Sequence, residues 1–316
     1  SPRTPSHASR RAATEMGDTD DGAAAPNAGA ARAGTTRALA ARLRYLLKLS
    51  RPRFWLYLAG PVVVAVAYAA DTVGALFAPL AVALFVYFLL PANVLLYGVN
   101  DVFDADVDEE NPKKEGREVR FEGDQVVLAS VVLSGLLGLS LFVVVPRVAW
   151  GYLAGFFILG VEYSAPPLRF KTTPLLDSLS NGLYVLPGAA TYAALSGTHP
   201  PLLALAGGWA WTMAMHTFSA IPDIEPDRRA GIETTATVFG HDWSFVYCGA
   251  LWLAAAGLFA ALDVRLGVLL LSYPLVLVGV YGSGVDIDRA YWWYPALNTV
   301  VGALLTMGAL WVMLYG

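Results

Sequence analysis

Long apolar segments alternate with short polar ones along most of this chain. From residue 54 onward, each apolar segment is near the length that crosses about 30 Å of hydrocarbon as a helix. Nine such spans are expected, at residues 54–70, 78–99, 126–145, 148–163, 175–195, 202–221, 244–262, 266–282 and 291–314. Since hydrophobic residues make up 56% of the chain and charged residues 15%, the sequence predicts an all-α, polytopic membrane protein.

The first 38 residues have a different pattern. They are rich in Ala, Gly, Ser, Thr, Pro and Arg and show no apolar periodicity, so we expect a disordered tail. The transmembrane domain is therefore expected to cover residues 39–316. At its start, residues 37–53 have the composition of a short basic amphipathic helix that lies at an anionic membrane surface.

The Lys and Arg residues predict the orientation of the spans, because these residues accumulate in cytoplasmic loops. With a cytoplasmic N-terminus, every Lys and Arg from residue 37 onward falls on the cytoplasmic side except Arg147 and Arg265. This asymmetry predicts a multi-pass protein of the cell membrane. It also places the two acidic segments described next on the cytoplasmic face.

The first acidic segment follows the second predicted span. It holds six carboxylates between residues 100 and 110, and Asn100, Asp104 and Asp108 are spaced so that they share one helix face. Carboxylates this close repel one another unless a cation lies between them. Oxygen ligands on few residues, with space left for water and phosphate oxygens, suit Mg²⁺. The alternative is a solvated acidic loop.

The second acidic segment, residues 222–229, follows the sixth predicted span and again places two aspartates four residues apart, Asp223 and Asp227. Pro226 lies between them and cannot donate a backbone hydrogen bond, so we expect the chain to bend there. The proline can open a new helical turn that presents Asp227, Arg228 and Arg229 at a helix N-terminus, a position that suits anionic groups. Two acidic segments on one side of a membrane favour a site for a metal and a diphosphate over two solvated loops.

Polar residues inside the spans are further candidates. Asn93 and Tyr97 extend the stripe of Asn100 into the second span, where they can contact a substrate or hydrogen-bond a neighbouring helix. His216 lies seven residues before Asp223, on roughly the same face of the sixth span. For His216 a packed, hydrogen-bonding role is favoured over that of a catalytic base.

Arg169 and Lys171 follow a Pro-Pro turn at a membrane edge. Each can donate hydrogen bonds to phosphate oxygens, and each can equally be a topology residue of the cytoplasmic side. The sequence alone favours neither interpretation.

These motifs resemble those of the UbiA superfamily of intramembrane prenyltransferases. Residues 100–108 and 223–227 are similar to its two Asp-rich motifs, and residues 163–171 to the loop after its fourth helix; the resemblance extends over residues 42–316. It implies a nine-helix bundle with a cytoplasmic cap, in which two sets of residues hold Mg²⁺ and a prenyl diphosphate. The implied metal ligands are Asn100, Asp104, Asp108, Asp223 and Asp227, and the implied diphosphate ligands are Tyr163, Arg169, Lys171 and Arg228.

Within the family, residues 111–118 and 220–237 look most like the lycopene elongase branch of carotenoid synthesis. The resemblance implies that Mg²⁺ and the cations neutralise the leaving diphosphate of dimethylallyl diphosphate and that an alkene of lycopene captures the carbocation. The new tertiary cation then loses a proton or takes up water, which would add hydratase activity. The implied partners are a prenyl diphosphate, a lipophilic acceptor and membrane lipid, with no nucleic acid.

Two alternatives stay open. The same chemistry can serve another acceptor, such as a quinone precursor or a glycerol phosphate lipid. A cation-coupled transporter also contains carboxylates, but transporters usually hold them near the bilayer midplane, whereas the acidic segments here lie at the ends of spans.

Overall fold

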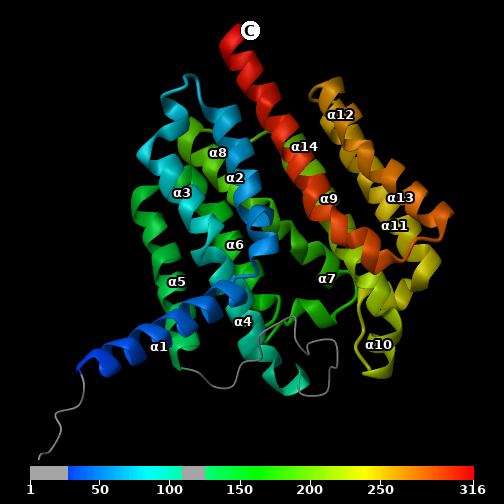
Figure 1. Ribbon diagram of the computed structural model, residues 1–316. Helices are drawn as coiled ribbons and strands as arrows, with labels where there is room; N and C mark the ends of the chain where they lie inside the picture. Colours follow the sequence, from blue (N-terminus) through cyan, green and yellow to red (C-terminus); the bar gives the residue numbers. More distant parts are fainter. Residues whose placement is uncertain (1–27, 109–124) are drawn as a thin grey trace, which may run out of the picture. The chain divides into compact units, whose positions relative to one another are not determined.

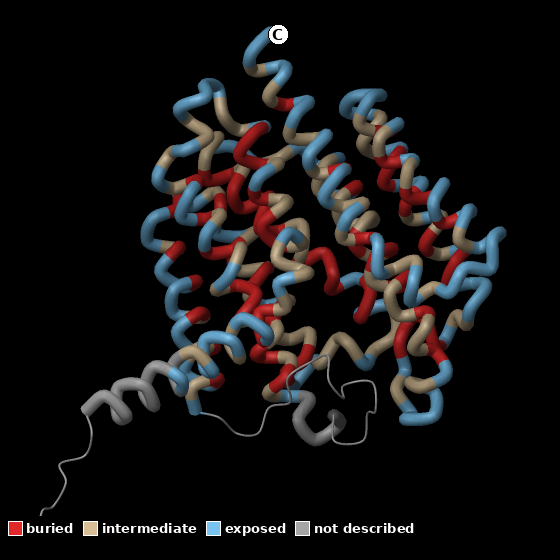
Figure 2. The backbone as a smooth tube through the Cα atoms, in the orientation of Figure 1, coloured by how far each residue is buried: buried red, intermediate tan, exposed pale blue. Residues whose placement is uncertain are grey.

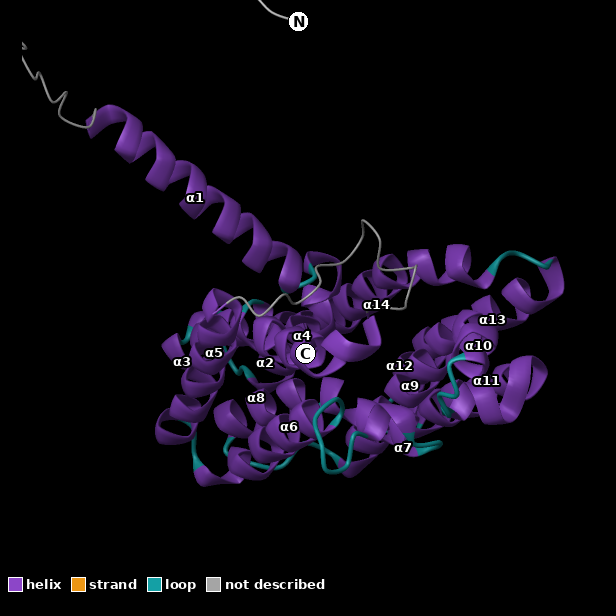
Figure 3. Ribbon diagram, turned by 90° about the horizontal axis from the view of Figure 1, so that it is seen from below, coloured by secondary structure: helices purple, strands orange, loops and turns teal. Residues whose placement is uncertain are grey.

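The computed structural model describes residues 28–108 and 125–316, and it describes their side chains except at 28–36, 38–39 and 104–108. Every regular element in these residues is a helix, as Figure 3 shows. The chain divides into a first unit, residues 1–43, and a second unit, residues 44–316. The described part of the first unit belongs to α1 (Ala28–Leu49), which begins within the predicted tail. The boundary between residues 38 and 39 stays a prediction.

The second unit contains all the other helices (Figure 1). The longer ones are α2 (Trp55–Ala69), α3 (Pro79–Leu89), α4 (Pro91–Asp108), α5 (Gln125–Val144), α6 (Trp150–Glu162), α8 (Leu186–Ser196), α9 (Leu202–Ala220), α11 (Thr235–Ala260), α13 (Ser272–Ser283) and α14 (Ile287–Tyr315). The shorter ones are η1 (Pro52–Phe54), η2 (Ala75–Phe77), η4 (Arg147–Ala149), η5 (Phe170–Thr172), α7 (Leu176–Leu179), η6 (Ser180–Tyr184), η7 (Ile221–Asp223), α10 (Ile224–Arg229) and α12 (Val264–Leu270).

Two large hydrophobic clusters form most of the interior of the second unit, and a smaller third one packs Leu49 against residues of α4 and α5. The first cluster packs side chains of α2, α3, α4, α6 and α8, among them the fully buried Leu58, Phe88 and Leu153. The second cluster packs side chains of α9, α11, α13 and α14, with Phe218 and Trp252 at its centre. Figure 2 shows buried positions concentrated in the inner part of the helical bundle and exposed positions along its outer helices.

The outer sides of the helices are themselves apolar. Large hydrophobic side chains such as Val143, Leu275 and Val278 are at least 70% exposed. In the described residues, six helical segments are long and apolar enough to cross a membrane: 52–69, 79–103, 125–144, 235–260, 264–283 and 287–315. The structure therefore confirms the predicted all-helical fold and supplies the apolar helices that a membrane protein requires.

The other three predicted spans are helical but do not meet the same criteria. The span at 148–163 forms the 13-residue α6, and the span at 175–195 is divided among α7, η6 and α8. The span at 202–221 forms α9, whose apolar character is reduced by polar side chains such as His216 and Ser219. The count of nine spans stays a prediction.

The second predicted span is not one continuous helix, because α3 ends and α4 begins on either side of Leu90. Pro91 has no backbone N–H and so interrupts the hydrogen-bond ladder. The buried side chain of Asn93 compensates by donating to the carbonyl oxygens of Phe88 and Leu89, both at 3.0 Å. Asn93 therefore stabilises a helix break.

The segment before α2 is tied to the last helix of the chain. The Arg53 Nη2 atom donates to the carbonyl oxygen of Trp292 at 2.7 Å, and its guanidinium carbon lies 3.6 Å from the centre of the Trp292 ring. Helices α2 and α14 also contact each other directly. Through these contacts α14 packs against elements of both large clusters.

We expect Gly182→Ala to destabilise the protein, because Gly182 of η6 leaves room for the ring of Trp209. A Cβ atom at Gly182 would lie 1.9 Å from Trp209 Cε2, and the indole Nε1 that it would displace donates to the Leu179 carbonyl oxygen at 2.8 Å. Overpacking of this kind costs about 1–3 kcal/mol. Thermal unfolding in detergent should show a lower Tm. The matched control is Gly151→Ala, where a Cβ meets no atom within 4 Å; equal Tm values for the two variants would contradict the expectation.

Candidate functional site

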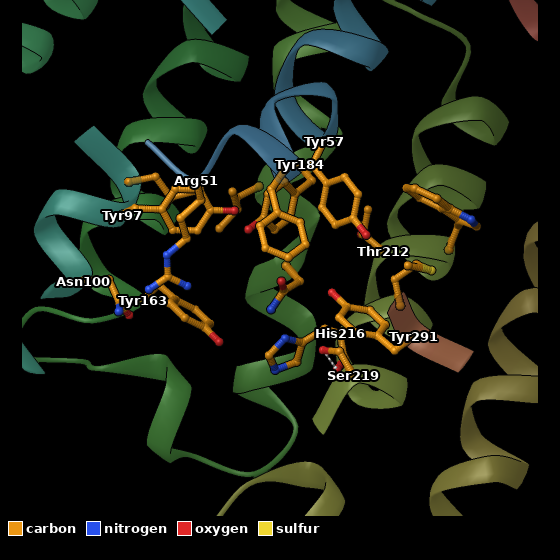
Figure 4. Close-up of a pocket in the computed structure, with 16 residues that line it drawn as sticks. Arg51, Tyr57, Tyr97, Asn100, Tyr163, Tyr184, Thr212, His216, Ser219 and Tyr291 are labelled. Atoms are coloured by element: carbon orange, nitrogen blue, oxygen red, sulfur yellow. Dashed lines mark hydrogen bonds between the residues drawn. The ribbon is translucent and has the colours of Figure 1, made fainter. Parts of the chain in front are cut away.

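A cavity of about 280 Å³ lies among helices of both large clusters. Seven of its sixteen lining residues are aromatic, and Figure 4 shows their rings arranged around the cavity. The lining residues are Arg51, Phe54, Tyr57, Leu96, Tyr97, Asn100, Tyr163, Asn181, Leu183, Tyr184, Trp211, Thr212, Met215, His216, Ser219 and Tyr291. Aromatic faces stabilise cations, so this lining suits a reaction that passes through a carbocation.

Arg51 places a cation at the wall of this cavity. Its backbone is in the left-handed region, with φ at 48°, which is uncommon for a residue that carries a Cβ. The side chain forms an ion pair with the buried Asp101, with Nη2 and Oδ1 3.3 Å apart, and its guanidinium carbon lies 4.7 Å from the centre of the Tyr97 ring. The composition of residues 37–53 predicted only a surface role for Arg51, because its pairing with residues of α4 depends on the fold.

Asn100 and the loop after α6 meet at the same cavity. The Ser164 hydroxyl donates to Asn100 Oδ1 at 2.9 Å, and the neighbouring Tyr163 lines the cavity together with Asn100. Arg169 Nη2 donates to the carbonyl oxygen of Phe103 at 3.3 Å, which links this loop to α4 a second time. The structure therefore brings part of the first acidic segment together with the predicted diphosphate-binding loop.

Lys171 lies in the same loop, in η5, and is half-buried. Its backbone N–H donates to the Tyr163 carbonyl oxygen at 3.1 Å, which closes the loop into a compact turn. Arg169 takes a left-handed backbone conformation within this turn, with φ at 41°. The loop thus holds both basic residues at fixed places beside Tyr163.

The second acidic segment folds differently from the expectation. The expected bend at Pro226 is wrong, since the change of helix type occurs earlier, in η7, and α10 begins at Ile224. Pro226 lies in the first turn of α10, where a backbone N–H would have no partner within the helix, so the proline fits without a break. Asp223 closes η7, Asp227 lies in the first turn of α10, and both side chains are half-buried.

Arg228 does not line the cavity. Its Nε and Nη2 atoms donate to the Thr237 carbonyl oxygen at 3.3 and 2.8 Å, and Nη1 pairs with Glu225 Oε1 at 3.2 Å. These bonds hold α10 against the start of α11.

The side chains of Asp104 and Asp108 lie outside the described residues. Among the residues whose side chains are described, no group of three or more His, Cys, Asp or Glu residues could hold a metal ion. The predicted metal ligands therefore remain predictions. Of the three whose side chains are described, Asn100, Asp223 and Asp227, Asn100 lines the cavity.

A buried carboxylate that sequence analysis did not select, Asp177, lies behind the cavity wall. It is 1% exposed, and Oδ2 accepts a hydrogen bond from the Thr235 backbone N–H at 3.0 Å. Oδ1 accepts from the Thr235 hydroxyl. His216 Nε2 lies 3.6 Å from Oδ2, and its ring meets that of Tyr163 edge to face, with ring centres 6.0 Å apart. The sequence did contain one signal for Asp177, because it is a single carboxylate inside the apolar span predicted at residues 175–195.

Comparison with known proteins adds an independent line of evidence. The model of the UbiA prenyltransferase family matches residues 58–315. Over 275 residues the chain is 67% identical to the lycopene elongase/hydratase of Haloferax volcanii, and this alignment covers 87% of the chain and 91% of the relative.

Two solved structures have the same fold. The structure of a UbiA homolog from Archaeoglobus fulgidus bound to GPP and Mg2+ has a TM-score of 0.67 at 20% identity and covers 84% of this chain and 99% of that chain. The same homolog bound to DMAPP and Mg2+ has a TM-score of 0.64 at 20% identity, covering 85% and 99%.

Proposed function

This chain belongs to the UbiA prenyltransferase family, and on that premise we propose that it transfers the prenyl group of dimethylallyl diphosphate to lycopene. The family predicted from the Asp-rich motifs is confirmed, and the protein is a prenyltransferase of the membrane. Lycopene is the proposed acceptor because the identity of 67% to a lycopene elongase/hydratase extends over most of both chains. The proposed products are an elongated carotenoid and its hydrated form.

The aromatic cavity beside Asn100 is the observation that carries this proposal. Seven aromatic rings enclose a space next to the proposed metal and diphosphate site, as a reaction through an allylic carbocation requires. The rings exclude water from the cation until the acceptor captures it. Arg51 lies at the same wall, where its guanidinium is paired with Asp101 and adds positive charge beside the proposed diphosphate site.

The size of the cavity fits the end of a lycopene molecule. Its volume of about 280 Å³ is below the roughly 300–1,000 Å³ of pockets that enclose a drug-sized ligand. A dimethylallyl group and the terminal unit of the acceptor can share such a space, while the rest of a long polyene lies in the surrounding lipid. The apolar outer sides of the helices are compatible with that arrangement.

The proposed metal ligands suit Mg²⁺. Asn100, Asp104, Asp108, Asp223 and Asp227 offer only oxygen atoms, the ligands that this ion prefers. Helices α4 and α10, which carry four of these residues, both lie at the lower end of the second unit in Figure 1. When bound, Mg²⁺ neutralises the diphosphate and makes it a better leaving group.

We assign the diphosphate to Tyr163, Arg169 and Lys171, because the loop that carries them is bonded to α4 at Asn100 and Phe103. Arg228 has a supporting role in this proposal, since its guanidinium bonds the Thr237 carbonyl oxygen and thereby holds α10 against α11.

The membrane arrangement is part of the same proposal. The nine predicted spans form the bundle, and the N-terminus, both acidic segments and residues 163–171 lie on the cytoplasmic side of the cell membrane. The distribution of Lys and Arg supports this orientation.

Mass analysis of products tests the proposal. The purified protein in liposomes is given lycopene, dimethylallyl diphosphate and Mg²⁺. We expect products heavier than lycopene by one or two five-carbon units, with or without added water, and no product when Mg²⁺ is chelated. Transfer to a quinone precursor or a glycerol phosphate lipid, with none to lycopene, would overturn the acceptor. Ion flux without prenyl transfer would instead support a transporter.

A further inference from the structure

We propose that His216 is the catalytic base that takes the proton released when the carbocation is quenched, and that Asp177 positions it. This inference rests on the proposed function and assigns a step within it. The proposed metal and diphosphate ligands account for ionisation of the donor, and none of them has been assigned to accept this proton.

The proton balance of the reaction requires such an acceptor. The donor loses diphosphate when its carbon–oxygen bond breaks, and a new carbon–carbon bond to the acceptor alkene leaves a tertiary cation. If a neighbouring carbon–hydrogen bond breaks, an alkene forms and one proton is released. If water adds to the cation, a carbon–oxygen bond forms and the bound water loses one proton to give the alcohol. Either branch delivers one proton to a base.

Among the described residues that line the cavity, His216 is the one suited to this role. The described part of the lining contains no Asp, Glu, Lys or Cys, and its other polar side chains are amides, hydroxyls, an indole and the Arg51 guanidinium. These groups are either too weakly basic or permanently charged at neutral pH. An imidazole can accept a proton and release it again near neutral pH.

Asp177 fixes which nitrogen of His216 is available. Nε2 lies 3.6 Å from Asp177 Oδ2, and a carboxylate at this place favours the tautomer with its proton on Nε2. The lone pair then belongs to Nδ1, which no described residue hydrogen-bonds. Figure 4 shows the His216 ring beside the cavity, near Tyr163 and Ser219. After the transfer, the carboxylate stabilises the imidazolium.

Asp177 is itself held rigidly. Both carboxylate oxygens accept hydrogen bonds from Thr235 at the start of α11, and the carboxylate is almost completely buried. Asp177 therefore also stabilises the junction of α7 and α11. A test must separate this structural role from the positioning of His216.

The test uses chemical rescue in the full-length protein in liposomes. We expect His216→Ala to lower kcat by about 10²-fold or more with little change in the KM for dimethylallyl diphosphate. Added 4-methylimidazole, which fills the space and supplies a base, should raise the kcat of His216→Ala at least tenfold. Toluene, which has a similar shape and no basic nitrogen, should leave this kcat unchanged. His216→Phe keeps an aromatic ring against Tyr163, and we expect the same loss of kcat.

The control is the histidine–carboxylate pair of His241 and Asp242, which is exposed and does not line the cavity. We expect His241→Gln to keep the wild-type rate. A wild-type rate in a folded His216→Phe variant would overturn the assignment. So would a His216→Ala variant whose kcat 4-methylimidazole does not raise, or whose kcat toluene raises equally. Failure of the wild-type protein to prenylate lycopene would instead contradict the proposed function.

Asp177→Asn tests the positioning role. The amide keeps the size of the side chain and can still bond Thr235, so the variant should remain folded. We expect kcat to fall by about tenfold or more, with the KM for dimethylallyl diphosphate within twofold of the wild type. Thr235→Ala removes the hydrogen bond from the Thr235 hydroxyl to Asp177 but leaves the contact between Asp177 and His216 in place. An equal loss of kcat in both variants at equal Tm would show that Asp177 acts only through α11.

Discussion

Asp227→Ala should lower prenyl transfer by at least about 10³-fold while the protein still inserts and folds. The variant removes a proposed ligand of Mg²⁺ from the first turn of α10, so charge on the leaving diphosphate is no longer neutralised. Asp104→Ala should have an effect of the same size from the other acidic segment. Turnover is measured at saturating Mg²⁺, with Tm as the check on folding.

The matched control for Asp227→Ala is Glu225→Ala in the same helix. Glu225 is exposed and pairs with Arg228, and it is not a proposed ligand. Its variant should stay within about threefold of the wild-type rate, as expected for the loss of an exposed ion pair. Retained turnover in either aspartate variant would contradict a metal site built from both acidic segments.

The double variant Arg169→Gln, Lys171→Gln should weaken donor binding and slow ionisation. Each charge-assisted bond to the diphosphate is worth about 2–3 kcal/mol, so the two losses together predict a decrease in kcat/KM of about 10³-fold or more. Rates are measured over a range of dimethylallyl diphosphate concentrations in correctly inserted protein. Since Arg169 also bonds the Phe103 carbonyl oxygen, a Tm measurement separates a loss of loop structure from a loss of donor contacts.

Arg147→Gln is the control for charge alone, because Arg147 precedes α6, at the end of that helix opposite the loop. If Arg169 and Lys171 serve only topology, the double variant inserts correctly and keeps the wild-type donor affinity and rate, since many other positive charges remain on the predicted cytoplasmic side. That outcome would remove both residues from the site.

Periodic features of the chain could be predicted from the sequence, and pairings between distant residues could not. Apolar runs predict helices because burial in lipid depends on composition, and the spacing of Asn100, Asp104 and Asp108 predicts a shared helix face because helical geometry is regular. The break at Leu90 was missed, because the apolar run continues across Pro91 and the compensating bonds of Asn93 depend on how α3 and α4 are oriented.

Asp177 and His216 show which part of the site could not be predicted from the sequence. They are 39 residues apart in the sequence, and each is a single polar residue within an apolar segment. Their proximity depends on the packing of α7 against α9 and on Thr235 from a third helix. Arg51 is comparable, because its role follows from contact with α4. Such pairings carry no periodic signal.

The bond between Arg53 and α14 bears on how the protein becomes active during synthesis. Tyr57 of α2 and Tyr291 of α14 line the same cavity, but the ribosome produces α14 much later than α2. Until α14 enters the bilayer, one wall of the cavity is missing, and a carbocation formed there would meet lipid and water. A nascent chain that lacks α14 therefore cannot shield the carbocation, so protected prenyl transfer requires the insertion of α14.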